Sequence, residues 1–248
     1  MHPVLLKIGP ITIYSYGLML ALGFLIALFG LLREAPNFNI REDYIFESVI
    51  LTIIGSIIGA RLGYVLIEWP KFSVEPWLIF DIRSGGLAFH GGFFGAILIL
   101  ILYCRYRSLS FLKLADFFAP YLALGYAFGR IGCFLNGCCY GEITSVPWAV
   151  TFAAVDSALR HPTQLYASLA GVISFILLRY LRKFHFFDGY LMSMFFLLYG
   201  IYRYINEFFR AESVMWGENS AGQLISLAMI FSALGVLLTM YLLKRGDE

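Results

Sequence analysis

Residues 129–141, GRIGCFLNGCCYG, are the densest group of reactive side chains in the sequence. They include a guanidinium, an amide and three thiols, from Arg130, Asn136, Cys133, Cys138 and Cys139. The apolar run before them carries no charge from Phe117 onward. An arginine at the edge of such a run is costly unless an anion lies opposite it. Since a guanidinium binds phosphate through two parallel hydrogen bonds, Arg130 is predicted to hold a phosphate group.

A second cationic group is predicted on the apolar run at 190–208. Arg203 and Glu207 are four residues apart, so they share one helix face, and Asn206 lies close to it. Arg203 is therefore a candidate second phosphate ligand, oriented by Glu207. Two alternatives stay open. Arg203 and Glu207 form a self-satisfied pair, or Glu207 pairs with Arg130 as a structural ion pair.

Two further polar residues within or beside the apolar runs are His90 and Tyr16. The glycines that bracket His90 let the backbone bend where it lines a cavity; they are Gly85, Gly86, Gly91 and Gly92. An imidazole there accepts a proton near neutral pH, and the alternative is a hydrogen-bonded structural histidine. Tyr16 lies at the outer end of the first run, where an interfacial-belt role is the default and a ligand role the alternative.

The three clustered cysteines suggest metal binding, yet no metal site and no cofactor are predicted. Their spacing is not CxxC, the histidines are distant in sequence, and zinc would need a fourth ligand. Cys133 is interpreted as a small apolar side chain that fills space. A catalytic thiol would need a lowered pKa, which the positive charge of Arg130 could supply.

The composition assigns the chain to the membrane proteins. Hydrophobic residues make up 60% of its 248 residues, charged residues make up 14%, and the mean hydropathy is +0.78. A soluble domain has about a quarter of its residues charged. The formal net charge of +2 is too small to argue for a nucleic-acid partner.

The hydropathy pattern predicts an all-α polytopic membrane protein with about seven transmembrane helices. Residues 1–14 are expected to lie on the interface, and PWAVTF at 147–152 is a candidate short strand. A run of about 20 apolar residues crosses ~30 Å of hydrocarbon. The predicted spans are 13–32, 45–67, 87–103, 116–132, 164–178, 190–208 and 224–243. The polar residues in or beside them are expected to face a polar cavity; they are Tyr16, Arg61, His90, Arg130, Asn136, Arg203, Asn206 and Glu207.

The distribution of lysine and arginine predicts the orientation. With the amino terminus outside, ten of these residues lie in cytoplasmic segments and six lie outside. This orientation puts the carboxyl terminus in the cytoplasm and the excursions at 142–162 and 212–219 outside. We expect a single transmembrane domain over 1–248 and a first helix that is retained rather than cleaved.

Six segments together resemble one protein family. They are SYGLM at 15–19, GARLGYVL at 59–66, RSGGLAFHGG at 83–92, GRIGCFLNGCCYG at 129–141, HPTQLY at 161–166 and YRYINEFFR at 202–210. In this order, and over nearly the whole chain, they resemble the prolipoprotein diacylglyceryl transferases. That family shares the predicted topology of seven spans with an outer amino terminus.

The resemblance implies a reaction in the bacterial cytoplasmic membrane. The diacylglyceryl group of phosphatidylglycerol passes to the lipobox cysteine thiol of a prelipoprotein, a thioether forms and glycerol phosphate leaves. His90, Arg130 and Arg203 would be catalytic. The positions that match the family's active centre or its support are Tyr16, His90, Arg130, Asn136, Gly141, Tyr199, Arg203 and Glu207.

The chain departs from the family signature GRxGNFxNxExxG at two positions. Cys133 stands where the family has asparagine, and Cys138 where it has glutamate. Two alternative functions therefore stay open. One is a paralogous glycerophospholipid-dependent transferase with another acceptor, and the other is a small-anion transporter or lipid flippase that uses the same arginines.

Overall fold

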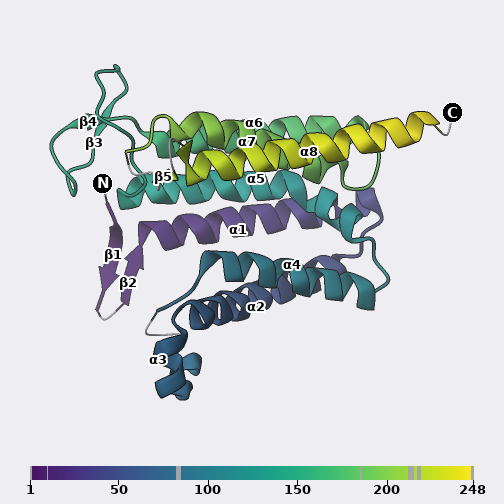
Figure 1. The fold of residues 1–248 in the computed structure, drawn as a ribbon, viewed down its shortest axis with the longest axis horizontal. Helices are drawn as coiled ribbons and strands as arrows, with labels where there is room; N and C mark the ends of the chain where they lie inside the picture. The colour runs from purple at the N-terminus through teal and green to yellow at the C-terminus, as the bar shows by residue number, and fades with distance from the viewer. Residues whose placement is uncertain are drawn as a thin grey trace. The chain divides into compact units, whose positions relative to one another are not determined.

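The computed structural model describes residues 2–9, 11–81, 85–184, 186–211, 215–216 and 219–246. Long helices dominate these residues (Figure 1). Their bounds are α1 Ser15–Glu34, α2 Glu42–Ile67, α4 Phe89–Tyr106, α5 Phe111–Asn136, α6 Thr163–Leu181, α7 Tyr190–Glu207 and α8 Ala221–Gly246. Shorter helices are α3 Trp69–Val74, η1 Ala35–Phe38, η2 Pro76–Phe80 and η3 Arg182–Phe184.

The strands of the described residues are short and pair as local hairpins, and β4 is also bridged to Ile143 through Arg160. They are β1 Val4–Ile8, β2 Ile11–Tyr14, β3 Val150–Thr151, β4 Leu159–Arg160, β5 Met215–Trp216 and β6 Asn219–Ser220. Each of the three antiparallel pairs joins consecutive strands. The strand predicted within 147–152 is present as β3, and the segment expected at the interface, 1–14, contains the β1–β2 hairpin with exposed apolar side chains.

Every predicted span corresponds to a helix, and the predicted all-α polytopic class is confirmed. Among the described residues, six helical segments are long and apolar enough to cross a membrane. They are Ser15–Phe38, Glu42–Ile67, Phe89–Tyr106, Phe111–Asn136, Thr163–Phe184 and Ala221–Leu243. The helix α7 has 18 residues, as many as α4, but its last turns carry the polar group around Arg203 and Glu207, so it is less apolar than these six segments.

The chain forms two compact units, one of Met1–Leu31 with Ala115–Glu248 and one of Leu32–Leu114. We call them the first and second units and describe each by itself. The single domain expected over 1–248 stays a prediction.

In the second unit, α2 and α4 pack backbone against backbone. A Cβ atom built on Gly59 would lie 2.3 Å from the carbonyl oxygen of Gly91, and one on Gly91 would lie 2.3 Å from that of Gly59. Small residues at such crossings bring helices together where lipid supplies no hydrophobic driving force. The glycine Gly91 beside His90 therefore serves helix packing, and not the bending of the backbone that the sequence suggested.

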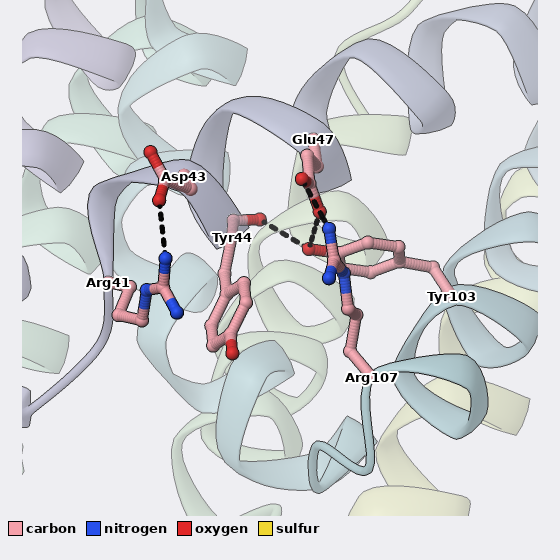
Figure 2. Close-up of polar contacts among 6 residues, drawn as sticks. All are labelled: Arg41, Asp43, Tyr44, Glu47, Tyr103 and Arg107. Atoms are coloured by element: carbon pink, nitrogen blue, oxygen red, sulfur yellow. Dashed lines mark hydrogen bonds and ion pairs between the residues drawn. The ribbon is translucent and has the colours of Figure 1, made fainter.

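A charged network joins the cytoplasmically predicted ends of α2 and α4 (Figure 2). Glu47 accepts hydrogen bonds from the Tyr103 hydroxyl at 2.8 Å and from Arg107 Nε at 3.0 Å. Arg107 Nη2 also bonds Glu47 Oε1 at 2.5 Å, which completes a bidentate pair. This network gives the glutamate predicted near the end of the second span its partners.

The first unit has a core in which α5, α6 and α7 meet. Its buried apolar residues are Ala119, Ala123, Leu178, Tyr190 and Leu191. The helix α7 packs against both α6 and α8 (Figure 1). The helix α5 therefore packs against α6 and α7 through the small side chains of Ala119 and Ala123, which lie on one face. This packing fixes the direction of the carboxyl-terminal end of α5, where Arg130 and the cysteines lie.

Asp116 of α5 caps the amino terminus of α7. Its Oδ2 accepts a hydrogen bond from the Gly189 amide and its Oδ1 one from the Met192 amide, both at 2.8 Å. Two amides at the start of a helix that lack an intrahelical acceptor are thereby satisfied. The Asp116 side chain is only 4% exposed. Water therefore cannot replace it as the hydrogen-bond acceptor of these two amides.

Asp116→Ala is expected to lower the free energy of unfolding by about 1–2 kcal/mol, the usual value of a side-chain cap. The midpoint of thermal unfolding in detergent measures this change. The control is Asp43→Ala, because Asp43 is 67% exposed in its pair with Arg41. Equal midpoints for the two variants would contradict the cap.

Candidate active site

The ends of five elements of the first unit converge. The His2 amide bonds the Leu135 carbonyl oxygen at 3.1 Å, which ties the start of the chain to the end of α5. The Gly141 amide bonds the His161 carbonyl oxygen at 3.0 Å, and Gly141 bridges to Arg210 beyond α7. Just before α8, the Ser220 hydroxyl donates a hydrogen bond to Glu207 at the end of α7, which joins the amino end of α8 to them. The carboxyl ends of α5 and α7 thus meet the amino ends of α1, α6 and α8.

Gly141 is the point where these segments approach most closely. A Cβ atom there would lie 2.5 Å from the Phe209 carbonyl oxygen and 2.8 Å from that of His161. No larger residue fits without moving the backbone. Gly141 is thus a point of close packing between three segments.

The excursion at 142–162 is held to this end by Arg160. Its Nη1 donates to the Gly141 carbonyl oxygen at 3.3 Å, and its guanidinium lies 5.1 Å from the centre of the Tyr140 ring. Arg160 also pairs with Asp156 at 2.5 Å, and this hydrogen bond lowers the pKa of the Asp156 carboxyl.

Arg130 lies among tyrosines. Its guanidinium carbon is 4.9 Å from the centre of the Tyr126 ring, and the Tyr126 ring lies 5.2 Å from that of Tyr199 and 6.4 Å from that of Tyr202. In the described part of the chain, no carboxylate forms an ion pair with Arg130. The predicted alternative of a structural pair with Glu207 is therefore not what the structure shows.

The same site contains buried polar atoms that lack partners. The hydroxyl oxygens of Tyr126 and Tyr202 and the amide oxygen of Asn206 are buried with no hydrogen bond of ordinary geometry to any described residue. Buried polar atoms in proteins are normally paired, so each such atom calls for an explanation. A polar ligand beside Arg130 would give these atoms a partner.

Glu207 is paired within α7, as the spacing predicted. Its Oε2 accepts a short hydrogen bond from Arg203 Nη1, and its Oε1 accepts one from the Ser220 hydroxyl at 3.0 Å. Arg210 Nε is 3.9 Å from the same carboxylate. Glu207 is 7% exposed, so the carboxylate fixes Arg203 from the buried side. Arg203 and Arg130 both interact electrostatically with Tyr202, so both lie near its ring.

Tyr16 and Asn136 border the same region. Tyr16, in the first turn of α1, is 40% exposed and packs where a Cβ atom on Gly132 would lie 3.1 Å from its ring. It interacts electrostatically with Arg130. Asn136 is the exposed last residue of α5. The structure thus brings together Tyr16, Arg130, Tyr199, Arg203 and Glu207; Gly141 packs beside the end of α7 and Asn136 ends α5, whereas His90 belongs to the second unit.

His90 is an exposed residue in the first turn of α4. Gly85 and Gly86 before it have φ of +85° and +78°, a conformation that glycine adopts freely. Arg83 and Ser84 of the motif at 83–92 lie outside the described residues, as does most of the predicted excursion at 212–219.

Arg61 has a different role from the one its sequence position suggested. It was expected to face a polar cavity. Its side chain is instead buried, and its N–H donors are used on the backbone carbonyl oxygens of Leu78, Ile79, Asp81, Gly85 and Gly86. A guanidinium has five donors, so none remains for an anion. Arg61 therefore fixes the connection that leads into α4 and His90.

Arg61→Lys is expected to loosen this connection, because an ammonium has three donors and cannot reach all these carbonyl oxygens. The loss should be about 1–3 kcal/mol for the buried acceptors left unpaired. Limited proteolysis in detergent should cut within residues 75–88 faster than in the unchanged chain. Arg105→Lys, at an exposed position of α4, is the control. An unchanged digestion rate for Arg61→Lys would contradict this role.

Three thiols gather at the end of α5, a feature that sequence spacing did not predict. The Sγ atoms of Cys133, Cys138 and Cys139 all lie within 4.8 Å of one another. Sequence reasoning also missed Tyr126 and Tyr202, although Tyr126 precedes Arg130 by four residues and therefore shares its helix face.

These features define a class: a polytopic α-helical membrane protein with half-buried arginines suited to an anionic group. A sequence model of the prolipoprotein diacylglyceryl transferase family matches residues 3–239. A Finegoldia magna protein named phosphatidylglycerol–prolipoprotein diacylglyceryl transferase is 38% identical over 252 residues, covering 100% of both chains. One of that name from Pseudoalteromonas translucida is 36% identical over 247 residues, covering 96% of this chain and 92% of its own.

The chain belongs to the prolipoprotein diacylglyceryl transferase family. The predicted family and enzyme class, a transferase, are confirmed. With its apolar helices and bacterial relatives, the chain is a multi-pass bacterial membrane protein.

Proposed function

We propose that this chain transfers the diacylglyceryl group of phosphatidylglycerol to the lipobox cysteine thiol of prelipoproteins. Family membership supports the reaction, and the relatives' names contain both phosphatidylglycerol and prolipoprotein. The structural observation that carries the proposal is Arg130, a guanidinium beside half-buried tyrosines that no described carboxylate neutralises. A lipid phosphate supplies the missing negative charge.

The transfer is a substitution at carbon. The acceptor sulfur bonds to the glyceryl carbon that bears the phosphate, and the carbon–oxygen bond breaks. Glycerol phosphate leaves with the electron pair, so negative charge grows on its phosphate in the transition state. Donors already aimed at such a charge stabilise the transition state more than the bound substrate. Arg130 and Arg203 take this role, and Glu207 holds Arg203 in place.

The acceptor thiol must lose its proton to become a nucleophile, since an ordinary cysteine has a pKa of about 8.5. His90 is the proposed acceptor of this proton. It is exposed, and the Arg61-anchored connection fixes the backbone that leads to it. Tyr16, Asn136, Gly141 and Tyr199 complete the proposed phosphatidylglycerol site.

The proposed setting is the bacterial cytoplasmic membrane, with the amino terminus outside. The site then opens at the outer face, beside the excursion at 142–162. Lysine and arginine counts support this orientation. Phosphatidylglycerol would enter laterally from the bilayer, and the lipobox segment would approach from the same membrane face.

Complementation tests the acceptor. In a bacterium depleted of its own transferase, expression of this chain should restore growth and add a diacylglyceryl mass to a reporter lipobox peptide. Failure to rescue by a stably inserted chain would overturn the proposal. Transfer to a different thiol or lipid would identify the paralogous transferase, and lipid flux in liposomes without any product would identify a transporter.

A further inference from the structure

We propose that Cys133, Cys138 and Cys139 form a three-thiolate site for a soft d10 metal cation, with Zn²⁺ as the principal ligand. The proposal shares Arg130 with the reaction assigned above, but it rests on the positions of the thiols and its test measures metal binding rather than transfer. It revises the expectation that the chain has no metal site, which came from the sequence spacing of the cysteines and histidines and from the need for a fourth ligand. The three sulfurs are now placed in space.

The distances suit such an ion. Zinc–sulfur bonds are about 2.3 Å long, so thiolates around one zinc ion are ~3.8–4.0 Å apart. The three Sγ atoms lie within 4.8 Å of one another, so side-chain movements of at most about 1 Å would close the site. Zinc takes four ligands, and sites with three protein ligands keep one position for water or another molecule.

The backbone that presents the thiols is fixed before any metal binds. After Cys133 the chain turns through Gly137, with φ +80°, and Cys139 has φ +59°, which is uncommon for a residue with a side chain. Gln164 Nε2 donates to the Cys138 carbonyl oxygen at 2.6 Å, and Thr163 Oγ1 to that of Cys139 at 2.7 Å. Both donors are 1% exposed. Two buried side chains of α6 therefore keep the unusual turn in place.

The charges also suit a metal–thiolate centre. Three thiolates and one Zn²⁺ carry a net charge of −1, which would be costly near lipid without a cation. Arg130 interacts electrostatically with both Cys133 and Cys139. Thiolates are the preferred ligands of Zn²⁺ and Cu⁺, whereas Mg²⁺ and Ca²⁺ prefer oxygen. The site therefore selects thiophilic cations.

Co²⁺ binding to the full chain, purified reduced in detergent, tests the proposal. We expect about one Co²⁺ per chain, thiolate-to-cobalt charge-transfer absorption, and displacement by Zn²⁺ but not by Mg²⁺. The triple variant C133S/C138S/C139S should bind more than about 100-fold more weakly, since even a residue that only orients a ligand is worth about 10- to 100-fold. Cys104→Ser, in the second unit, is the control and should bind normally.

Three results would overturn the site: reduced protein that binds no Co²⁺, binding that survives in the triple variant, or thiols that form a disulfide and bind no metal after reduction. If the triple variant fails to fold, Cys138→Ser alone replaces it. That variant keeps two thiols, and unchanged affinity in it would equally contradict a three-thiolate site.

Discussion

Arg130→Ala is expected to slow diacylglyceryl transfer by about 100- to 1,000-fold, the usual effect of removing a donor aimed at transition-state charge. The reason is local. Arg130 lies against Tyr126, which packs on Tyr199 and Tyr202, and no described carboxylate competes with a phosphate for its charge. The measurement is the initial rate of thioether formation with purified protein, phosphatidylglycerol and a lipobox peptide.

Arg130→Lys separates charge from geometry. Lysine keeps the positive charge but loses the planar fork that binds two phosphate oxygens, so we expect a smaller loss of rate than with alanine. Arg105→Ala, at an exposed position of α4, is the matched control and should transfer at the unchanged rate. Near-normal rates in Arg130→Ala, in protein that inserts normally, would refute the phosphate clamp.

Arg203→Ala is expected to cost about 100-fold in the same assay, because Arg203 is the second donor to the leaving phosphate. Glu207→Gln should lower the rate less, since Glu207 acts by holding Arg203. The two roles can be separated by combining the changes. With Arg203 already replaced, Glu207→Gln should have little further effect on kcat, because its target is gone.

Full additivity of the two changes would mean that Glu207 acts independently of Arg203. A loss confined to thermal stability, with kcat unchanged in the folded fraction, would assign the pair to the fold alone. Ser220→Ala is a useful companion. It removes the 3.0 Å hydrogen bond to Glu207 and leaves both charges in place.

The positions of the long helices could be predicted from the sequence, because the lengths of the apolar runs alone indicate them. The predicted span at 45–67 and the helix Glu42–Ile67 differ by one turn at one end, where Glu42 and Asp43 favour a helix start. The β1–β2 hairpin could not be predicted, because its strands are short and exposed and carry little alternation. The division into two compact units also leaves no sign in the hydropathy.

The site was predictable where local spacing decides it. Arg203 and Glu207 pair four residues apart, as expected. The tyrosines around Arg130 come from two helices, so only packing brings them together. The three-thiol cluster depends on a left-handed turn at Cys139, which no propensity predicts. The role of Arg61 was missed because recognition of backbone carbonyl oxygens leaves no residue pattern.

The central claim is that this chain joins a diacylglyceryl group to a cysteine thiol. Its most direct test uses the purified chain in phosphatidylglycerol liposomes with a synthetic lipobox peptide, followed by mass spectrometry. The account predicts a peptide heavier by one diacylglyceryl group, with one glycerol phosphate released for each adduct and no product when serine replaces the peptide cysteine. A folded, inserted chain that yields no adduct, or that modifies the serine peptide equally, would contradict it.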